Sequence, residues 1–288
     1  MLKRIYITIG VVKMKINLLK KLAILMAISS ISISIIGCGS TVVSSKKETS
    51  SSSLETIKKN GKLTIGTSAD YPPYEFHKEI DGKDTIVGLD IKIAEAIASD
   101  LGVELEIKDM DFDGLLVALQ ANKIDMAFAA MNPTEERKQN ADFSEIYNRE
   151  KHVFIMRKAE VNSISSMDDL KDKKIGVQKG SVQENLVHEN LPNAETKALG
   201  KVTDLILDLK NNKVDAILVD LPVGKFNAEK NPDIALTSLL LEDESDGAAI
   251  ALKKGSDELV TEVNKTISRL KSENKIDEFI IESNNLMD

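Results

Sequence analysis

The two residues best suited to chemistry are an arginine and an aspartate, each of which follows one copy of an internal repeat. Residues 115–129 match residues 205–219, because Leu, Leu, Asn-Lys and Asp recur in register with aliphatic residues around them. Each copy reads as a helix, a tight Asn-Lys turn and a buried strand. Arg137 lies in the segment after the first copy, and Asp220 directly follows the second. One loop therefore carries a cation and the other an anion, which suits a zwitterion bound between them.

The elements that must position these residues alternate between strand and helix patterns. This alternation predicts an α/β architecture with parallel strands. The repeat predicts two similar lobes rather than one continuous sheet, and the alternative is generic helix-turn-strand punctuation. Ligands of open α/β sheets bind beyond the carboxyl ends of the strands, so we expect the site at loops 130–137 and 220–222. The expected strands are 62–66, 103–107, 124–130, 174–178 and 214–219, and the expected helices are 89–101, 112–122, 181–190, 202–210 and 257–283.

The single cysteine, Cys38, ends an apolar run that basic residues precede and a Ser-rich stretch follows. This layout predicts a secretory signal peptide over residues 1–37. Residues 35–38 resemble a bacterial lipobox, in which the cysteine becomes the lipidated N-terminus. We therefore expect Cys38 to carry a lipid such as palmitate, and residues 38–53 to tether the protein to the outer face of the cell membrane.

Three other readings of the N-terminal region stay open. Translation starting at Met14 would make residues 1–13 an annotation extension. In the second reading, Cys38 is a buried core thiol. In the third, the apolar run is an uncleaved membrane anchor, although this run is short for a membrane span and is diluted by serines. A single cysteine also allows no internal disulfide.

The charge of the chain excludes some classes of partner. The formal net charge is -8, and loss of residues 1–37, which hold six basic and no acidic residues, would make it -14. Nucleic acid is a poor partner for such an acidic protein, since that affinity comes mainly from Lys and Arg on phosphates. Contact with an anionic membrane is expected only through the N-terminus.

Signatures of catalysis and metal binding are weak. His77, His152 and His188 lack metal-ligand spacing, so we interpret each as a surface or packing residue. There is no Gly-rich phosphate loop, nucleophile elbow or cysteine pair. Asp111 and Asp113 could form a carboxylate pair, but helix capping is the favoured interpretation.

The main candidate residues also have structural interpretations. Arg137 would ordinarily form a surface ion pair with Glu135 or Glu136. Asp220 ends an apolar strand, where a charge is costly unless it has a partner. The structural alternative is that Asp220 caps a helix that starts near residue 222. Ser181 precedes a helical pattern, and it serves either as a cap or as part of a helix N-terminus that binds a carboxylate.

Several stretches together resemble a known family. The chain is similar, over nearly all of residues 62–282, to family 3 of the bacterial extracellular solute-binding proteins of amino-acid ABC transporters. It looks closest to the branch that binds arginine and other polar amino acids. The stretches that carry the resemblance are 66–76 (GTSADYPPYEF), 87–90 (VGLD), 110–114 (MDFDG), 132–138 (NPTEERK), 142–144 (DFS), 176–181 (GVQKGS) and 214–220 (VDAILVD).

The resemblance implies ligand-binding roles for nine residues. Arg137 matches the arginine that forks onto the ligand α-carboxylate, a geometry that Lys cannot supply. Ser181 matches a second donor to that carboxylate, and Asp220 the acid that takes the α-ammonium. Tyr71 and Phe112 match aromatics that enclose the ligand side chain. The remaining positions are Ala130 and Asn132, which contact the ligand, and Ser68 and Gln178, which bear on its identity.

One position departs from the family pattern. Relatives that bind basic ligands often carry an acid at the position of Ser68. Asp70, Asp111 and Asp113 could supply negative charge nearby, so the sequence leaves the identity of the amino acid open.

The resemblance also implies the fold and the function. The expected fold is two-lobed, periplasmic-binding-protein-like (type II), with a sheet flanked by helices in each lobe and two hinge crossings. Lobe 1 would comprise residues 54–149 and 247–288, and lobe 2 residues 150–246. The protein would capture arginine, lysine, histidine or glutamine and deliver it to the membrane permease of an ABC importer. We expect a monomer without catalysis, cofactor or metal. The alternatives are a cyclohexadienyl dehydratase-like enzyme and the ligand-sensing subunit of a receptor.

Overall fold

The computed structural model describes residues 52–149, 151–245 and 247–286. Cys38, the signal peptide and nearly all of the tether lie outside these residues, so the expectations for them stay predictions. No helix within the described ranges combines the length and the apolar character that a membrane span requires.

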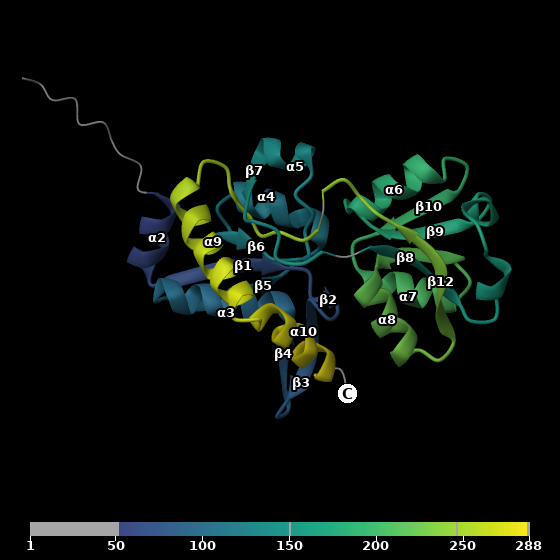
Figure 1. Ribbon diagram of the computed structural model, residues 1–288, viewed down its shortest axis with the longest axis horizontal. Helices are drawn as coiled ribbons and strands as arrows, with labels where there is room; N and C mark the ends of the chain where they lie inside the picture. Colours follow the sequence, from purple (N-terminus) through teal and green to yellow (C-terminus); the bar gives the residue numbers. More distant parts are fainter. Residues whose placement is uncertain (1–51, 150, 246, 287–288) are drawn as a thin grey trace, which may run out of the picture. The chain divides into compact units, whose positions relative to one another are not determined.

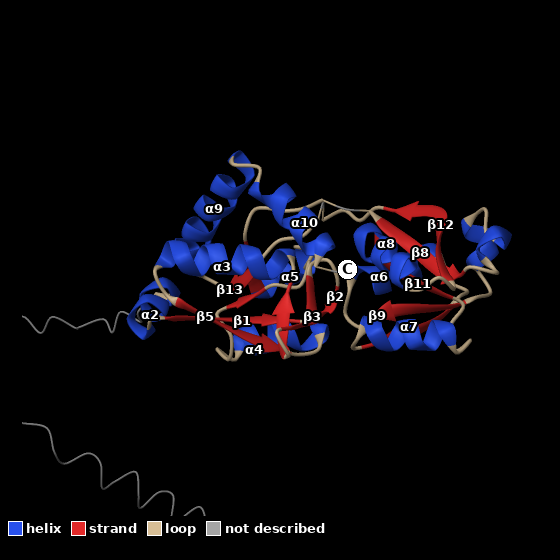
Figure 2. Ribbon diagram, turned by 90° about the horizontal axis from the view of Figure 1, so that it is seen from below, coloured by secondary structure: helices blue, strands red, loops and turns tan. Residues whose placement is uncertain are grey.

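A five-stranded mixed sheet forms the first lobe (Figure 1). In spatial order its strands are β5 (Glu104–Asp109), β1 (Lys62–Thr67), β6 (Met126–Ala127), β13 (Ala251–Lys253) and β7 (Ala141–Phe143). Strand β1 is parallel to β5 and β6, whereas β13 is antiparallel to β6 and β7. The helices of this lobe are α2 (Ser53–Asn60), α3 (Leu89–Leu101), η1 (Phe112–Gly114), α4 (Leu115–Gln120), α5 (Glu135–Asn140), α9 (Asp257–Ser272) and α10 (Lys275–Asn285). Figure 2 shows α3 on one face of the sheet and α4 on the other.

A second five-stranded sheet has the same plan. Its order is β10 (Glu195–Leu199), β9 (Lys174–Gln178), β11 (Ala216–Asp220), β8 (His152–Arg157) and β12 (Ile234–Leu241). Strands β10, β9 and β11 are parallel, and β8 is antiparallel to β11 and β12. Its helices are η2 (Val161–Ser163), η3 (Met167–Leu170), α6 (Val182–Asn190), α7 (Val202–Lys210) and α8 (Leu221–Lys230). The expected α/β fold with two similar lobes is confirmed, although each sheet is mixed rather than wholly parallel.

The chain crosses between the sheets twice. It leaves the first sheet after β7, enters the second at β8, and returns between β12 and β13. The two crossing segments pair at one antiparallel bridge, Asn148 with Ala248. Residues 50–288 form one compact unit. The lobe boundaries predicted from the sequence, 54–149 with 247–288 and 150–246, remain a prediction.

A small three-stranded sheet carries site residues of the first lobe. It comprises β2 (Asp70–Tyr71), β3 (Glu75–Ile80) and β4 (Lys83–Val87), all antiparallel. Helix α3 follows it at Gly88, whose φ of 133° is unfavourable for any other residue. A Cβ at Gly88 would collide with the Tyr74 carbonyl oxygen, so glycine is required for α3 to start against this sheet.

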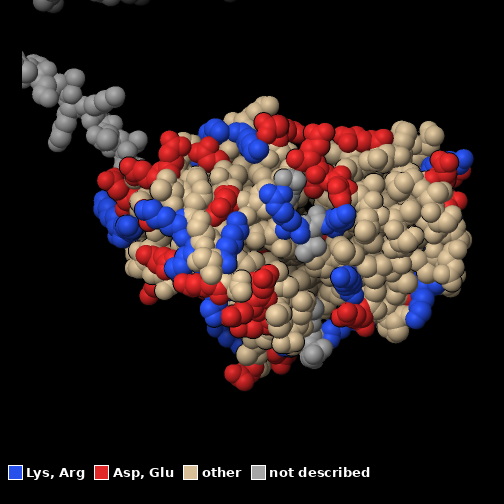
Figure 3. Space-filling view, viewed as in Figure 1, with Lys and Arg blue, Asp and Glu red and all other residues tan. Residues whose placement is uncertain are grey.

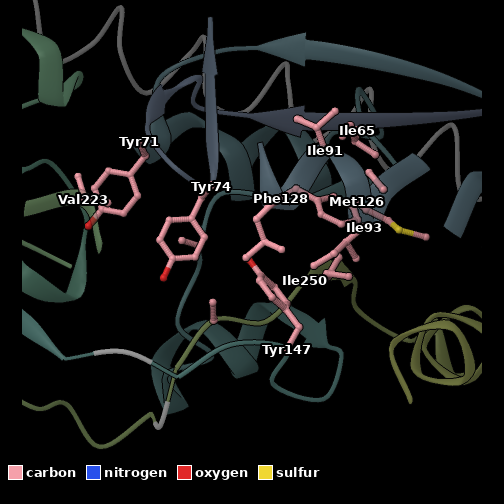
Figure 4. Packing of buried hydrophobic residues seen from close by; sticks show 14 of the residues in the cluster. Ile65, Tyr71, Tyr74, Ile91, Ile93, Met126, Phe128, Tyr147, Val223 and Ile250 are labelled. Atoms are coloured by element: carbon pink, nitrogen blue, oxygen red, sulfur yellow. The ribbon is translucent and has the colours of Figure 1, made fainter. Parts of the chain in front are cut away.

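The helix predicted over residues 89–101 is confirmed as α3. Ile91, Ala94, Ile97 and Ala98 are all buried. Figure 4 shows part of this core, in which α3 side chains pack with those of the first sheet, including Met126. Burying one such aliphatic side chain contributes about 1.5–3 kcal/mol, so this face of α3 fixes the start of the helix near the site.

Two expected elements differ from the prediction. The apolar run 124–130 is almost entirely buried, but only Met126 and Ala127 are strand. The chain leaves the ladder at Ala130, which has a φ of 45° and donates its N–H to Asp90 Oδ2. The expected helix over 257–283 is two helices, α9 and α10, because Asn274 between them adopts a left-handed conformation with a φ of 55°. Apolar periodicity reports burial and does not reveal either break.

Candidate ligand-binding site

A small cavity lies where the carboxyl ends of strands from both sheets meet. The cavity is narrow, because the centre of a water molecule can occupy only about 10 Å³ of it. Seven of the nine residues implied by the family resemblance line it, together with three that the sequence analysis missed. The lining residues are Tyr71, Phe112, Ala129, Ala130, Asn132, Gln178, Ser181, Val182, Gln183 and Asp220.

Arg137 reaches from the first lobe to the second. It lies in the first turn of α5, where the Thr134 hydroxyl accepts its backbone N–H at 3.3 Å. Nη1 donates to the Asn132 carbonyl at 2.7 Å, and Nη2 donates to the Gly180 carbonyl at 2.8 Å. The guanidinium also lies over the Phe112 ring, 5.3 Å from its centroid. Arg137 thus bridges the lobes at the edge of the cavity but is not among its lining residues.

The guanidinium of Arg137 has no carboxylate partner within the part of the chain that the structure describes. The alternative pairing with Glu135 or Glu136 is not formed, and Lys138 pairs with Glu135 instead. Burial lowers the pKa of Arg137 to about 10, although nearby Glu136 and Asp243 oppose the shift. The side chain therefore stays cationic at neutral pH and suits an incoming anion.

Asp220 ends strand β11 and is only 6% exposed. Its Oδ1 accepts from Nδ1 of His152 at 2.8 Å and from Nε2 of Gln183 at 2.9 Å. Its backbone N–H donates to the Tyr71 hydroxyl at 3.0 Å. Asp220 occupies the N-cap position of α8, yet its side chain makes no capping hydrogen bond. The capping alternative is therefore wrong, and the carboxylate faces the cavity and its polar partners.

His152 corrects the interpretation of the histidines as surface or packing residues. It is buried between two carboxylates, and Nε2 lies 2.9 Å from Oδ2 of Asp243. Burial alone would lower its pKa, but hydrogen bonds and charges from Asp220 and Asp243 outweigh it and raise the pKa to about 9. Because Asp243 is 91 residues away, no local sequence signal could have found the pair.

Ser181 and Gln178 come from the second lobe. Ser181 caps α6, since its Oγ accepts the Glu184 N–H at 3.3 Å. Gln178 ends β9 and donates weakly to the Gly200 carbonyl at 3.4 Å. Both side chains are buried at the cavity wall, next to the amino end of α6. A helix start of this kind favours negative charge.

Ala130, Asn132 and the aromatics come from the first lobe. Asn132 Nδ2 donates to Asp243 Oδ2 at 3.2 Å, which connects the cavity wall to the second crossing segment. The Tyr71 ring stacks on Tyr74 with centroids 6.0 Å apart. Phe112 is buried below Arg137. The lining of the cavity therefore combines aromatic and aliphatic side chains with polar ones.

Ser68 is not brought to the cavity. It is 1% exposed, and its Oγ donates to Asp70 Oδ1 at 2.8 Å. The other Asp70 oxygen accepts the backbone N–H of Val202, the first residue of α7 in the opposite lobe. Asp70 therefore caps a helix across the lobe boundary and is not free to meet a ligand side chain. The predicted role of Ser68 in ligand identity remains a prediction.

The capping interpretation of the two further acids, Asp111 and Asp113, is not supported by a capping hydrogen bond of Asp111. Asp113 pairs with Lys179 at 2.7 Å across the lobes, and Asp111 makes no capping hydrogen bond. On the molecular face in Figure 3, basic and acidic side chains are interspersed.

Comparison with known proteins gives a family. Residues 63–282 match the bacterial extracellular solute-binding proteins, family 3. The chain is 34% identical over 264 residues to the arginine-binding extracellular protein ArtP of Bacillus subtilis (strain 168), covering 90% of this chain and 96% of that protein.

Solved structures that share the fold include two with different ties to amino-acid binding. One is the amino acid ABC transporter substrate-binding protein AbpA of Streptococcus pneumoniae bound to L-arginine, with 41% identity, a TM-score of 0.79, and coverage of 81% of this chain and 98% of that one. The other is the ancestral amino acid-binding protein AncCDT-1, a precursor of cyclohexadienyl dehydratase, with 30% identity, a TM-score of 0.73, and coverage of 80% and 99%. This chain belongs to family 3 of the bacterial extracellular solute-binding proteins.

Proposed function

We propose that this protein is an extracytoplasmic amino-acid-binding protein that holds a polar or basic L-amino acid between its two lobes and delivers it to an ABC importer. The observation that carries the proposal is that Asp220, an anion of one lobe, lines the cavity, while Arg137, a cation of the other lobe, lies at the edge of the cavity and reaches the Gly180 carbonyl across the lobes. A free amino acid carries both complementary charges, so it bridges the lobes only when they close on it.

Each implied residue takes a defined role in this proposal. Arg137 binds the α-carboxylate with Ser181, and Asp220 accepts the α-ammonium. Tyr71 and Phe112 enclose the side chain. The remaining contacts are assigned to Ala130, Asn132 and Gln178, which line the cavity, whereas Ser68 does not line it and donates to Asp70. Charge-assisted hydrogen bonds contribute about 1.5–3 kcal/mol each, so three of them supply most of the roughly 8 kcal/mol of micromolar affinity.

Arginine is the first candidate ligand, with lysine, histidine and glutamine after it. A relative named for arginine binding and a solved structure bound to L-arginine support this order. Asp70 is occupied by Ser68 and Val202, so a basic ligand side chain would need another polar partner. Gln178 lines the cavity. The Asp111 carboxylate lies beside the Gly200 backbone.

A thermal-shift screen of the purified 39–288 protein against the twenty amino acids tests the proposal. A ligand that binds only the native state raises the melting temperature by mass action. We expect the largest increase with arginine, lysine, histidine or glutamine. An increase confined to leucine, isoleucine and valine would contradict the polar-ligand assignment.

The enzyme alternative has a direct assay. AncCDT-1 is named as a precursor of cyclohexadienyl dehydratase, so this scaffold has a link to that chemistry. Incubation with prephenate or arogenate, followed by absorbance, would reveal a dehydratase. We expect no turnover, because the cavity has a complete set of partners for a zwitterion. A receptor subunit would instead bind its ligand without stimulating uptake by a permease.

We further propose that the folded part is a monomer held at the outer face of the cell membrane by a lipid on Cys38. The proposal includes a signal peptide over 1–37 and a tether over 38–53. Cys38→Ala should leave amino-acid affinity unchanged and either release the protein or leave the precursor unprocessed. Fractionation and mass spectrometry would read this out, and normal membrane retention of a processed variant would contradict lipidation at Cys38.

A further inference from the structure

His152 lies at the point where the chain enters the second lobe. It is the first residue of β8 and is 1% exposed. Its Nδ1 is 2.8 Å from Asp220 Oδ1, in the register of the β8–β11 pair. Its Nε2 is 2.9 Å from Asp243 Oδ2, in the segment that returns to the first lobe. One imidazole therefore joins the first crossing, the second crossing and the candidate ammonium acceptor.

This geometry suits a charged ring. A neutral imidazole has a single N–H, so it can donate to only one of two facing carboxylates. Only the imidazolium donates to both carboxylates. A buried network of charged groups is stable when every group in it has its hydrogen-bond partner. The pKa of about 9, raised by Asp220 and Asp243 against the effect of burial, agrees with this state at neutral pH.

Within residues 52–149, 151–245 and 247–286, few other charges lie near the imidazole. Gln183 Nε2 is 3.2 Å from Nδ1 and donates to the same Asp220 oxygen. Asp243 Oδ1 accepts the Ser245 N–H at 2.7 Å and also the Ser245 hydroxyl. Among the described residues, the other charged or titratable groups nearby are the Lys151–Glu242 surface pair, Tyr71 beyond Asp220, and Arg137, whose pKa is affected by the charge of Asp243.

We propose that His152 is a positioning residue for amino-acid binding, whose imidazolium fixes one oxygen of Asp220 and leaves the other for the ligand ammonium. The second Asp220 oxygen has no hydrogen bond among the described residues, in agreement with this assignment. The proposal rests on the proposed function. It adds that a proton on His152 is needed for tight binding, because that proton orients Asp220 and ties it to Asp243.

Substitution of His152 separates positioning from simple charge. A cation beside Asp220 should weaken binding of another cation, so removing it would tighten binding if charge alone mattered. If His152 acts by positioning, His152→Gln should bind amino acid at least about tenfold more weakly at pH 7 by calorimetry. Tighter or unchanged binding by a folded variant would overturn the proposal.

Asp243→Asn provides a second test that keeps the histidine. Loss of one carboxylate should lower the pKa of His152, which selective ¹⁵N-histidine NMR can follow because the chain has three histidines. Between about pH 5.5 and about 7.5 the ammonium group of an amino acid stays protonated. In this variant, affinity should fall as pH rises, with a midpoint at the measured His152 pKa, whereas wild-type affinity stays flat.

Ser245→Ala is the matched control, since it removes a hydroxyl donor to Asp243 but keeps the carboxylate. It should leave both the His152 proton and the pH profile as in wild type. A neutral His152 ring in the wild-type protein at pH 7, or a flat profile for Asp243→Asn across its NMR transition, would overturn the proposal. Failure of the wild type to bind any amino acid would instead refute the proposed function, and the ligand-free NMR titration separates the two results.

Discussion

The two lobes bury acidic groups near the cavity in different ways. In the first lobe, Glu75 and Asp90 are both buried, and no cation pairs with either among the described residues. In the second, Asp220 and Asp243 share His152. The first arrangement favours the neutral form of one acid, Glu75, whereas the second places an imidazole between two carboxylates. The cavity is therefore lined by a carboxylate of the second lobe, Asp220, whereas the first lobe places the Arg137 guanidinium at its edge, where it donates to the Asn132 and Gly180 carbonyls.

The neutral acid of the first lobe has a physical cause. Burial, and then the charge of Asp90, raise the pKa of Glu75 well above its ordinary 4.5. Burial also raises the pKa of Asp90 to about 6, although Ala130 and Tyr147 donate hydrogen bonds to it. At neutral pH we therefore expect Asp90 to be ionised and Glu75 to be protonated. Asp90 can then hold the Ala130 N–H at the cavity wall.

Removal of the charged acid should have the largest effect on binding. Asp220→Ala deletes the ammonium acceptor and leaves His152 with one carboxylate, so affinity should fall by about 100-fold or more, equal to about 3 kcal/mol. Calorimetry on the folded variant measures this. Unchanged affinity would show that the second lobe does not supply the anion.

The matching test on the first lobe is Arg137→Lys. Lysine keeps the charge but cannot donate in a planar fork to two acceptors at once. Affinity should fall by about 30-fold, or about 2 kcal/mol, by the same calorimetric measurement. Wild-type affinity would mean that charge alone is sufficient and that the fork is not used.

A third prediction tests the neutral acid. Folded Glu75 keeps its proton while unfolded Glu75 ionises above its ordinary pKa of 4.5, so the wild type loses this stability as pH rises. The free energy of unfolding of Glu75→Gln, relative to that of the wild type, should increase as pH rises, by up to about 1.4 kcal/mol per pH unit above about pH 5. Urea unfolding between about pH 5 and about 7 measures the difference.

Glu79→Gln is the control for that measurement, because Glu79 lies on the same strand but is exposed. It should leave the pH dependence unchanged. If the difference in the free energy of unfolding between Glu75→Gln and wild type stayed constant across this range, folded Glu75 would be ionised. That result would remove the contrast between the lobes.

The smallest expected effect concerns closure rather than the cavity. Asp70→Ala removes the cap of α7 across the lobes, a contact that exists only when they meet. A lost cap costs about 1 kcal/mol, so affinity should fall by about fivefold for every bound amino acid alike. A loss confined to arginine and lysine would show instead that Asp70 contacts the ligand side chain.

Much of the fold follows from local sequence. The 3.6-residue period of α3, the two helix–turn–strand repeats and the positions of Arg137 and Asp220 are all visible in the sequence. These features depend on neighbouring residues, whose spacing along a helix or strand fixes which side is buried. The two charges that follow the repeats were therefore expected at one site, and most residues implied by the family resemblance do line the cavity.

The tertiary structure alone decided how those charges are held. His152 meets Asp220 and Asp243 from 68 and 91 residues away, and Asp70 reaches Val202 across 132. The sequence also could not show that strand β6 ends after two residues, since the buried run continues beyond it. Periodicity encodes burial, whereas partners across a lobe boundary are set only when both crossings of the chain are in place.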